Sequence, residues 1–299
     1  ATTAIILSAH NSLCSGPILA YGTEEQKQKY LVPLAKGEKL GAFALTEPNA
    51  GTDSAAQETS AVLDGDHWIL NGSKCFITNG GQADIYIIIA MTDKSKGNRG
   101  ISAFIVEKDT PGFTIGKLEH KMGIRASATA ELIFDNCIIP KENLLGEVNK
   151  GFKIAMNTLD GGRIGVAAQA LGIAEGAFDE AVKYMNERVQ FRKKISSFQG
   201  LQWMCADMKC SIESARLLVY RAAACKQAGK DFQEEAAMAK LSASRTAMDV
   251  TTKCVQLFGG YGYSREYPVE RMMRDAKITE IYEGTSQVQQ MVIAGRIFK

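Results

Sequence analysis

The sequence has 299 residues, of which 45% are hydrophobic and 23% are charged, so the chain can hold one large domain or two to three small ones. The formal net charge is only +2, which excludes the strong positive field that binding to nucleic acid requires. No apolar run approaches the roughly 20 residues of a membrane-spanning helix. The start of the chain lacks the basic region and the cleavage site of a signal peptide. We therefore expect no nucleic-acid or membrane partner.

The cysteines and histidines offer little material for a metal site. No Cys-x-x-Cys pair occurs, and His10, His67 and His120 lie far apart in the sequence. Most of the cysteines stand in apolar contexts and their number is odd, so we expect reduced, buried thiols in a bacterial cytoplasm or a mitochondrial matrix. The cysteines are Cys14, Cys75, Cys137, Cys205, Cys210, Cys225 and Cys254.

The first 38 residues have the pattern of short helices separated by breaks. A helix is expected up to about His10, followed by a turn at Ser15-Gly16-Pro17. Thr23 is in the position of an N-cap for a further helix over residues 24–31. These residues predict a short N-terminal helical segment.

Residues 41–140 consist of short runs rich in β-branched and aromatic residues, separated by Asp-Gly, Asn-Gly and Pro-Gly pairs. Asn71-Gly72 stands between two such runs, residues 68–70 and 74–77, and this pattern predicts a β-hairpin. Further strands are expected over residues 85–90, 102–106, 113–115 and 130–134. Several short strands spaced by turns predict a central β-barrel or sandwich domain.

From about residue 146 to the end, apolar residues at spacings of three and four predict long helices. One such stripe, typical of a four-helix bundle, consists of Met204, Met208, Ile212, Ala215 and Val219. Helices are expected over residues 151–159, 163–191, 198–227, 232–258, 268–282 and 286–297. The order of elements predicts an α+β fold with domains at residues 1–38, 39–150 and 151–299. No Gly-x-Gly-x-x-Gly opens a helix after a strand, so a Rossmann nucleotide site is not supported.

The segment around Glu283 joins two of these predicted helices. An apolar approach ends at Tyr282, Glu283 and Gly284 follow, and Thr285 or Ser286 can cap the next helix. In one interpretation, the break points the carboxylate into a cleft and Gly284 leaves room for a ligand. In the other, Glu283 is an acid at a helix end that precedes an ordinary capping glycine. Both interpretations fit the residues of the segment.

Four motifs along the chain match one protein family in that family's order. They are Phe43-Ala44-Leu45-Thr46-Glu47-Pro48-Asn49-Ala50-Gly51-Thr52-Asp53, Phe76-Ile77-Thr78-Asn79-Gly80, Gln256-Leu257-Phe258-Gly259-Gly260-Tyr261-Gly262 and the segment 274–287. With them the sequence resembles the acyl-CoA dehydrogenases over essentially its whole length. The run at residues 158–165 resembles the short-chain branch, the butyryl-CoA dehydrogenases. The resemblance implies an oxidoreductase that uses FAD, with a further helical segment upstream of residue 1 that this chain lacks.

The resemblance implies that the loop over residues 43–52 lines the flavin. Thr46 would donate a hydrogen bond to the isoalloxazine, and Thr52 would lie between flavin and acyl-CoA. Phe76 would complete the wall, because an aromatic ring against a flavin face excludes water. From the residues alone, the loop also fits an ordinary surface turn and Phe76 fits core packing. The residues implied here are Phe43, Leu45, Thr46, Gly51, Thr52, Phe76, Ile77 and Thr78.

A second group of FAD-binding residues is implied on the helices, toward the cofactor of a neighbouring subunit. The guanidinium of Arg188 would bind the pyrophosphate, although a lone arginine is also common as an exposed helix charge. The Gly259-Gly260 pair allows close approach of backbone to the cofactor. Relatives often have glycine after the aromatic residue at Phe191, where this chain has Arg192. The residues implied are Arg188, Gln199, Gln256, Leu257, Phe258, Gly259, Gly260, Thr285, Ser286 and Gln287.

The resemblance makes Glu283 the catalytic base, which would remove the α-proton of an acyl-CoA thioester while the flavin accepts a hydride from the β-carbon. The Glu283 N–H and a flavin ribityl hydroxyl would hold the thioester carbonyl. A carboxylate with an ordinary pKa of about 4.3 is a weak base for a C–H acid, so we expect burial to raise the pKa of Glu283. Some branches of the family carry their base at the position of Gly162, where glycine cannot serve.

Substrate contacts are implied for a predicted helix kink at residues 160–163. There the side chains of Asp160 and Arg163 flank two glycines, and a solvated ion pair between them is the alternative. By resemblance, Arg163 would lie beside the CoA moiety. The residues implied to bind substrate are Thr52, Asp160, Gly161, Gly162, Arg163 and Gly284.

The resemblance also implies partners. An electron transfer flavoprotein would reoxidise the reduced flavin, and a homotetramer built as a dimer of dimers is expected. The reverse reduction of a trans-2-enoyl-CoA uses the same residues. Two rival functions stay open at this point: a catalytically idle scaffold that binds acyl-CoA or FAD, and an acyl-CoA oxidase of the same fold.

Overall fold

The computed structural model describes residues 1–298, which divide into two compact units. Unit 1 comprises residues 1, 121–124 and 163–298, and unit 2 comprises residues 2–120 and 125–162. Each unit is described by itself. None of the helices among residues 1–298 is long and apolar enough to cross a membrane. The division into three domains remains a prediction.

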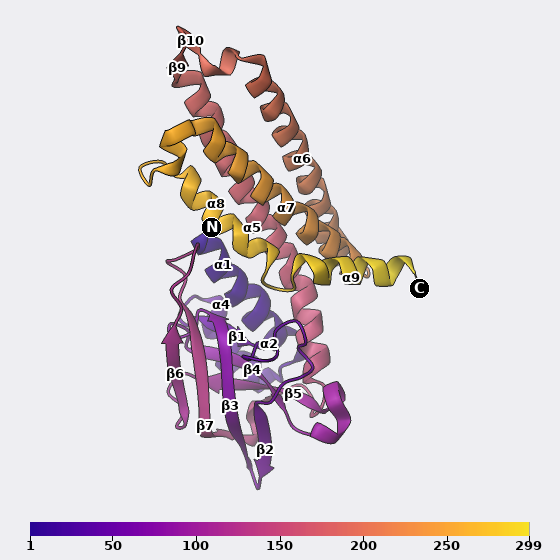
Figure 1. Ribbon diagram of the computed structural model, residues 1–299. Helices are drawn as coiled ribbons and strands as arrows, with labels where there is room; N and C mark the ends of the chain where they lie inside the picture. Colours follow the sequence, from indigo (N-terminus) through magenta and orange to yellow (C-terminus); the bar gives the residue numbers. More distant parts are fainter. Residues whose placement is uncertain (299) are drawn as a thin grey trace. The chain divides into compact units, whose positions relative to one another are not determined.

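Unit 2 begins with a series of short helical segments (Figure 1). Thr23 caps one of them as predicted: the Gln26 N–H donates to Thr23 Oγ1 at 3.2 Å, and the Thr23 N–H donates to Gln26 Oε1 at 3.1 Å. The turn predicted at Ser15-Gly16-Pro17 is wrong. Pro17 lies in the first turn of a helix, where its missing N–H has no partner to lose. The segments are α1 (Thr2–Ser8), η1 (Ala9–Ser15), α2 (Gly16–Tyr21), α3 (Glu24–Gln26), η2 (Lys27–Leu31) and α4 (Val32–Ala35).

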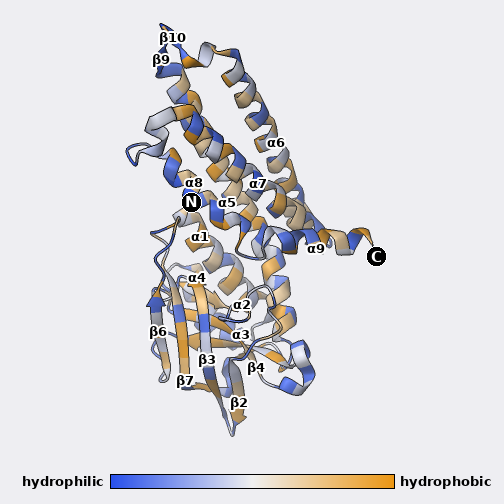
Figure 2. Ribbon diagram, in the orientation of Figure 1, coloured by the Kyte–Doolittle hydropathy of each residue, from blue (hydrophilic) through white to orange (hydrophobic). Residues whose placement is uncertain are grey.

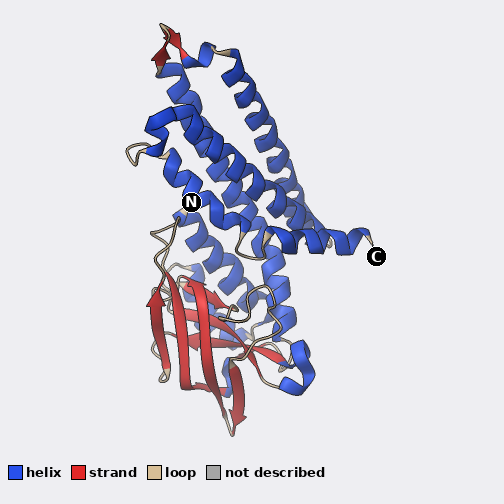
Figure 3. Cartoon of the chain, viewed as in Figure 1, coloured by secondary structure: helices blue, strands red, loops and turns tan. Residues whose placement is uncertain are grey.

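The strands of unit 2 join in one eight-stranded mixed sheet (Figure 3), in the order β6-β7-β3-β2-β4-β5-β8 with β1 parallel to β4. The strands predicted at residues 85–90, 102–106, 113–115 and 130–134 are found as β4, β5, β6 and β7, each somewhat longer than predicted. The strands are β1 (Gly41–Ala44), β2 (Ser60–Asp64), β3 (His67–Thr78), β4 (Ile85–Met91), β5 (Ile101–Glu107), β6 (Phe113–Leu118), β7 (Thr129–Pro140) and β8 (Leu144–Leu145). Two short 3-10 helices, η3 (Lys94–Gly100) and η4 (Lys141–Asn143), connect some of them.

The hairpin predicted at Asn71-Gly72 is wrong, because β3 continues through both residues. The hairpin turn lies at Gly65-Asp66, where β2 passes into β3. Gly72 has a φ of +138°, at a shift in the register between β3 and β7. A Cβ on Gly72 would lie 2.7 Å from Thr59. The glycine therefore permits the close approach of a neighbouring segment.

Strand β4 is buried on both faces, and this explains its unbroken apolar sequence. Ile87 and Ile89 pack in one core with side chains from the N-terminal helical segments and from the start of α5. Tyr86 and Ile88 face a second core, formed with β3, β5 and β7. The sheet thus carries a separate apolar core on each side.

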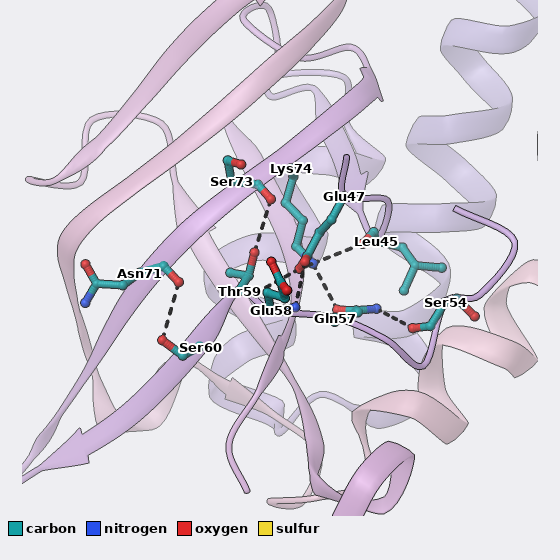
Figure 4. Close-up of polar contacts among 10 residues, drawn as sticks. All are labelled: Leu45, Glu47, Ser54, Gln57, Glu58, Thr59, Ser60, Asn71, Ser73 and Lys74. Atoms are coloured by element: carbon teal, nitrogen blue, oxygen red, sulfur yellow. Dashed lines mark hydrogen bonds and ion pairs between the residues drawn. The ribbon is translucent and has the colours of Figure 1, made fainter. Parts of the chain in front are cut away.

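A buried ammonium ties the end of β1 to β3 (Figure 4). Lys74 has no exposed side-chain surface, and its Nζ lies 2.7 Å from Glu47 Oε1 and 2.9 Å from Gln57 Oε1. Lys74 Nζ also donates to the carbonyl of Leu45 at 3.0 Å. The next residue, Cys75, donates its N–H to the carbonyl of Thr46 at 2.9 Å. Two successive carbonyls after β1 are therefore fixed by β3.

The carboxylate of Glu47 is equally well supplied with partners. It accepts the backbone N–H groups of Glu58 at 2.7 Å and of Thr59 at 3.1 Å. Burial alone would raise the pKa of Glu47, but Lys74 and these donors lower it. Burial lowers the pKa of Lys74 to about 8 against the attraction of Glu47. With a lowered pKa for Glu47 and a pKa of about 8 for Lys74, both side chains are ionised at neutral pH, and their hydrogen bonds are satisfied.

Unit 1 is built on long helices. The helix break predicted at residues 160–162 is wrong, because a single helix, α5, runs from residue 151 to 187. Each glycine inside a helix lowers its stability by only about 1 kcal/mol relative to alanine, and tertiary packing can offset this loss. The predicted helix over residues 268–282 instead ends at Lys277. The helices are α5 (Gly151–Glu187, of which residues 163–187 belong to unit 1), η5 (Ile195–Ser197), α6 (Gln199–Gln227), α7 (Gln233–Phe258), η6 (Gly259–Tyr263), α8 (Val269–Lys277), η7 (Ile278–Glu280) and α9 (Ser286–Ile297).

Small residues form the core between the helices of unit 1. Figure 2 shows hydrophilic and hydrophobic residues alternating along α6 and α7, as expected for helices with one buried stripe. Ala170 and Ala174 of α5 share a core with Met208 of α6 and Ala243 of α7. Alanine at these positions lets the helices approach closely, so the prediction of a C-terminal helical bundle, and with it the α+β fold class, is confirmed.

A two-residue hairpin connects α5 to α6. Its strands are β9 (Val189–Gln190) and β10 (Lys193–Lys194), and Gln190 pairs with Lys193 across the turn. Both turn residues are left-handed, Phe191 with a φ of +53° and Arg192 with a φ of +66°. Hairpin turns of this kind favour Asn-Gly, so the departure at Arg192 places a strained residue where glycine would fit.

We expect Lys74→Met to destabilise unit 2 by about 3 kcal/mol, because it leaves Glu47 as an uncompensated buried charge. Glu47→Gln in addition should recover part of this loss, so the double variant costs less than the sum of the single variants. Urea unfolding followed by the fluorescence of buried Trp68, in a Trp203→Phe background, measures both. Lys27→Met, which removes an exposed ion pair with Glu24, is the control and should change little. Strict additivity in the double variant would contradict the coupling.

We expect Arg192→Gly to stabilise unit 1 by about 0.5 kcal/mol, since relief of left-handed strain exceeds the entropy that glycine adds to the unfolded chain. Lys193→Gly, one residue later in a strand, should destabilise by a similar amount. Thermal unfolding of both variants, compared at equal protein concentration, tests this. A destabilised Arg192→Gly would show that the arginine side chain makes a contribution larger than the strain.

Candidate functional site

The segment between η7 and α9 holds Glu283 in a strained turn. Glu283 has a φ of +50° and Gly284 a φ of +92°. Left-handed backbone is uncommon for a residue other than glycine and is concentrated at functional sites. A Cβ on Gly284 would also lie 2.8 Å from Gln289 Nε2, so glycine is required there for both conformation and space. The turn therefore fixes the direction of the Glu283 side chain.

The carboxylate of Glu283 is buried without a partner. The residue as a whole is half-buried, but both carboxylate oxygens are buried and accept no hydrogen bond from any group among residues 1–298. Burial raises the pKa of Glu283 to about 7, while Lys240 and Arg163 act in the opposite direction. The expected rise in pKa is thus confirmed, and Glu283 is not a solvated acid at a helix end. A buried, unsatisfied carboxylate needs a functional explanation.

Three side chains hold the backbone of this turn. Gln289 Nε2 donates to the carbonyl of Gly284 at 2.8 Å and to that of Glu283 at 3.3 Å. Lys240 Nζ donates to the Gly284 carbonyl at 2.7 Å, and Arg163 Nε donates to the Glu283 carbonyl at 3.4 Å. Sequence reasoning placed Arg163 at the substrate and missed both Lys240 and Gln289. The available signal was a polar residue at a core position of an otherwise apolar helix stripe.

Residues beside the turn lie as the capping pattern indicates. Thr285 is the N-cap of α9, and its hydroxyl accepts the Val288 N–H at 3.3 Å. Ser286 Oγ donates to the carbonyl of Glu280 at 3.5 Å, while Gln287 is exposed. The hydroxyl of Tyr282 donates to Gln169 on α5. The roles of Thr285, Ser286 and Gln287 toward FAD remain predictions.

A cavity of about 860 Å³ in unit 1 brings together most of the second predicted group. It is lined by Arg188 and by the segment 256–260, with aromatic side chains around them. The guanidinium of Arg188 lies 5.4 Å from the ring centre of Tyr261, a cation–π contact. Gln199 is exposed and is not among the lining residues. A half-buried arginine beside glycine backbone suits a diphosphate, so these residues fit the phosphate-bearing part of a dinucleotide.

In unit 2, the loop after β1 contains a tight turn in which the Ala50 N–H donates to the Glu47 carbonyl at 3.1 Å. Thr46 is half-buried, and Gly51 and Thr52 are exposed, so their polar groups can reach a ligand. Phe43 and Leu45 instead belong to the apolar core on one face of the sheet. Their side chains therefore support the loop, and only their backbone is available to a cofactor.

Phe76 is an exposed aromatic on a strained backbone. Its side chain is 64% exposed and its φ is +58°, at a register shift in β3. The alternative of core packing is therefore wrong for Phe76, although Ile77 beside it is buried in the core. An exposed ring held by a bulge fits a flat aromatic ligand. Thr78 is half-buried and follows at the end of the strand.

The residues predicted to form a kink lie in regular helix. Asp160, Gly161 and Gly162 belong to the part of α5 in unit 2, where both glycines are buried. Their contact with substrate remains a prediction. Residues 1–298 contain no group of three or more His, Cys, Asp or Glu side chains that could hold a metal ion. The cysteines are free thiols, and burial raises the pKa of Cys14 and Cys254 to about 12.

Comparison with known proteins identifies the family. Profiles of the acyl-CoA dehydrogenase N-terminal, middle and C-terminal domains match residues 1–38, 42–137 and 149–298. The short-chain-specific acyl-CoA dehydrogenase of Clostridium acetobutylicum is 68% identical over 100% of this chain and 79% of its own length. The structure of butyryl-CoA dehydrogenase from Megasphaera elsdenii superimposes with a TM-score of 0.98 and 64% identity, over 99% of this chain and 77% of that one.

A third similarity is to a chain in a structure described as the electron transferring flavoprotein of Acidaminococcus fermentans, with a TM-score of 0.98 and 64% identity over 99% of this chain and 78% of that one. All three domain profiles match in order, and the high identities extend over the whole length of this chain. The protein therefore belongs to the acyl-CoA dehydrogenase family.

Proposed function

We propose that the protein catalyses the α,β-dehydrogenation of short-chain acyl-CoA thioesters such as butyryl-CoA to trans-2-enoyl-CoA, or the reverse reduction. The family supplies the reaction class, and its cofactor is FAD. The chain length of the substrate is supported by the names of the similar proteins, which are short-chain-specific and butyryl-CoA dehydrogenases. Both directions of the reaction use the same residues.

The observation that carries the proposal is the buried, unpartnered carboxylate of Glu283. A base that removes a proton from carbon must be ionised in part at neutral pH and must also be a stronger base than an ordinary carboxylate. A pKa of about 7 meets both conditions. In this role Glu283 takes the α-proton of the thioester, and in the reverse direction it returns that proton.

The backbone of the same turn can serve the thioester carbonyl. Among residues 1–298, the Glu283 N–H donates no hydrogen bond to a backbone carbonyl, whereas the Tyr282 N–H before it donates to Ile278 at 3.1 Å. A free N–H beside the base is suited to the negative charge that develops on the carbonyl oxygen as the α-proton leaves. One residue then contributes both the base and an oxyanion donor.

The residues present fit FAD. In unit 2, the loop around Thr46 and Phe76 would hold its ring system. In unit 1, Arg188 and the 256–260 segment would hold phosphates of the FAD of a neighbouring subunit. When bound, FAD supplies the acceptor for the hydride that leaves the β-carbon. The protein's part is to bind and orient the thioester, exclude water and hold the base. An electron transfer flavoprotein is the proposed redox partner, in line with the third similarity, and a homotetramer is the proposed assembly.

We expect Glu283→Gln to retain binding of short-chain acyl-CoA and to lose turnover by at least about 10³-fold, because the amide cannot accept the α-proton. Anaerobic titration of the flavin-loaded protein with acyl-CoAs of graded length, read as loss of the yellow absorbance, measures both. Glu280→Gln, which removes a nearby acid paired with Lys277, is the control and should bleach within a few-fold of the unaltered protein. Bleaching of Glu283→Gln at the normal rate would remove Glu283 from the mechanism.

We expect the bleaching rate with a saturating short-chain acyl-CoA to rise with pH and to level off above a midpoint of about 7, the pKa of Glu283. The sign follows from the chemistry, since only the ionised carboxylate can accept a proton; below pH 6 the rate should fall about tenfold per unit. Stopped-flow absorbance at pH 5 to 9 measures the profile, and circular dichroism at each pH checks that the protein stays folded. A flat profile down to pH 5 would contradict this assignment.

A further inference from the structure

Lys240 is a buried cation, and the packing of the helices does not explain why a charged side chain occupies this position. It lies on α7 between Ala236 and Ala243, at a core position, and no part of it is exposed. Among residues 1–298 it forms no salt bridge, and its hydrogen bond is the one to the Gly284 carbonyl at 2.7 Å. Taking an ammonium out of water without a paired carboxylate is unfavourable by several kcal/mol. An apolar side chain would fill the same space at less cost.

The hydrogen bond of Lys240 to Gly284 places this unfavourable buried charge at the turn that carries Glu283. The backbone there is left-handed at two successive residues and has to be held in place by its surroundings. Lys240 and Gln289 both donate to the Gly284 carbonyl, one with a charge and one without. The two side chains are comparable donors to the Gly284 carbonyl, but only Lys240 carries a charge, and Gln289 also donates to the Glu283 carbonyl at 3.3 Å.

The charges around the Glu283 carboxylate come from several elements of unit 1. Helix α5 contributes Arg163 and α7 contributes Lys240. Glu280 of η7 acts on Lys240 and favours its charged form, while the uncharged Gln289 of α9 donates to the Glu283 carbonyl. Of the two cations, Lys240 has the larger influence opposing the effect of burial on the pKa of Glu283. Conversely, Glu283 is the main influence that favours the charged form of Lys240, which burial opposes.

We propose that Lys240 is a positioning residue for the reaction: its ammonium anchors the Glu283–Gly284 turn and provides the fixed positive charge that keeps the Glu283 carboxylate ionised at neutral pH. This inference rests on the proposed function, in which Glu283 is the base. In water-excluded surroundings, a cation near a carboxylate shifts its ionisation by about one pH unit or more. Without Lys240, the base would be largely protonated where the enzyme works.

The test compares Lys240→Met with Gln289→Leu in the flavin-loaded protein. Both remove a donor to the Gly284 carbonyl, but only the first removes a charge. We expect the midpoint of the pH–rate profile to move upward by about one unit in Lys240→Met, so that the rate falls about tenfold at pH 6 and recovers toward pH 9. In Gln289→Leu the rate should fall by a similar factor at every pH. An unmoved midpoint in Lys240→Met would overturn the proposal.

Lys253→Met is a charge control on the same helix, where Lys253 pairs with Asp249 at 2.7 Å on the surface. Loss of one positive charge there should leave the midpoint unchanged. If Lys253→Met moves the midpoint as far as Lys240→Met does, the effect belongs to the net charge of the protein and the proposal fails.

A second measurement does not depend on catalysis. A carboxyl group whose pKa is raised on folding binds more protons in the native than in the unfolded state, so stability falls as pH rises from about 4.5 toward the native pKa. Lys240→Met should extend this fall upward, giving a steeper loss of the urea midpoint between pH 7 and 8. Lys240, whose pKa burial lowers to about 8, also titrates near this range, so the comparison is made between proteins that lack it. Lys240→Met in the Glu283→Gln background should show no such loss, and a loss of the same size there would overturn the proposal. Normal turnover in Glu283→Gln would instead reject the proposed base, and the unfolding slopes would still report the coupling.

Discussion

The desolvation of one carboxylate is the constraint on which the site depends. Moving the pKa of Glu283 from 4.5 to about 7 corresponds to roughly 3 kcal/mol in favour of the protonated form. This preference makes the group a base of useful strength, and it would make the group inert if nothing opposed it. Lys240 and Arg163 oppose it, and the strained turn at Glu283 and Gly284 keeps the carboxylate in the buried position. Burial, counter-charge and backbone strain therefore act on a single residue.

Lys74 and Lys240, the two lysines that are buried among residues 1–298, have different roles. Lys74 is paired with Glu47, and that carboxylate also accepts two backbone N–H groups, so nothing remains to bind a ligand. Lys240 donates to a carbonyl, and the acid that it influences, Glu283, keeps both oxygens unpaired. A buried polar network whose hydrogen bonds are all satisfied stabilises the fold, whereas a buried carboxylate without partners can still bind or accept a proton from a ligand. In this chain the network of Lys74 holds the loop around Thr46, and Lys240 holds the base.

Much of the architecture could be predicted from local patterns in the sequence. Helix stripes gave α6, α7 and α9 to within one or two residues, and Thr23 and Thr285 were found as caps. The errors arose where tertiary packing outweighs local preference. Asn71-Gly72 has the residues of a hairpin turn, yet Gly72 is there so that Thr59 can approach, and the glycines at 161 and 162 sit inside a continuous helix. Such long-range contacts leave no local pattern.

The candidate site divides in the same way. Glu283, Arg188 and Phe76 were predicted from the resemblance to the family, and their roles remain predictions. The structure adds what is unusual about each: burial of Glu283, a cavity at Arg188 and exposure of Phe76. Lys240 and Gln289 were missed. Lys240 acts on Gly284, 44 residues along the chain, and Gln289 reaches back from α9 to the turn five and six residues before it. Their placement depends on the fold, which the spacing of residues alone does not reveal. A lysine at an apolar helix position was the only local sign.

The most direct measurement is a ¹³C NMR titration of the protein labelled at the side-chain carboxyl carbons of glutamate, with the Glu283 signal assigned from its loss in Glu283→Gln. Burial of the carboxylate without a hydrogen-bonding partner predicts a midpoint close to 7, far from the values of the exposed glutamates. A midpoint near 4.5 would mean that water reaches the carboxylate, and it would contradict the account of Glu283 as a desolvated base.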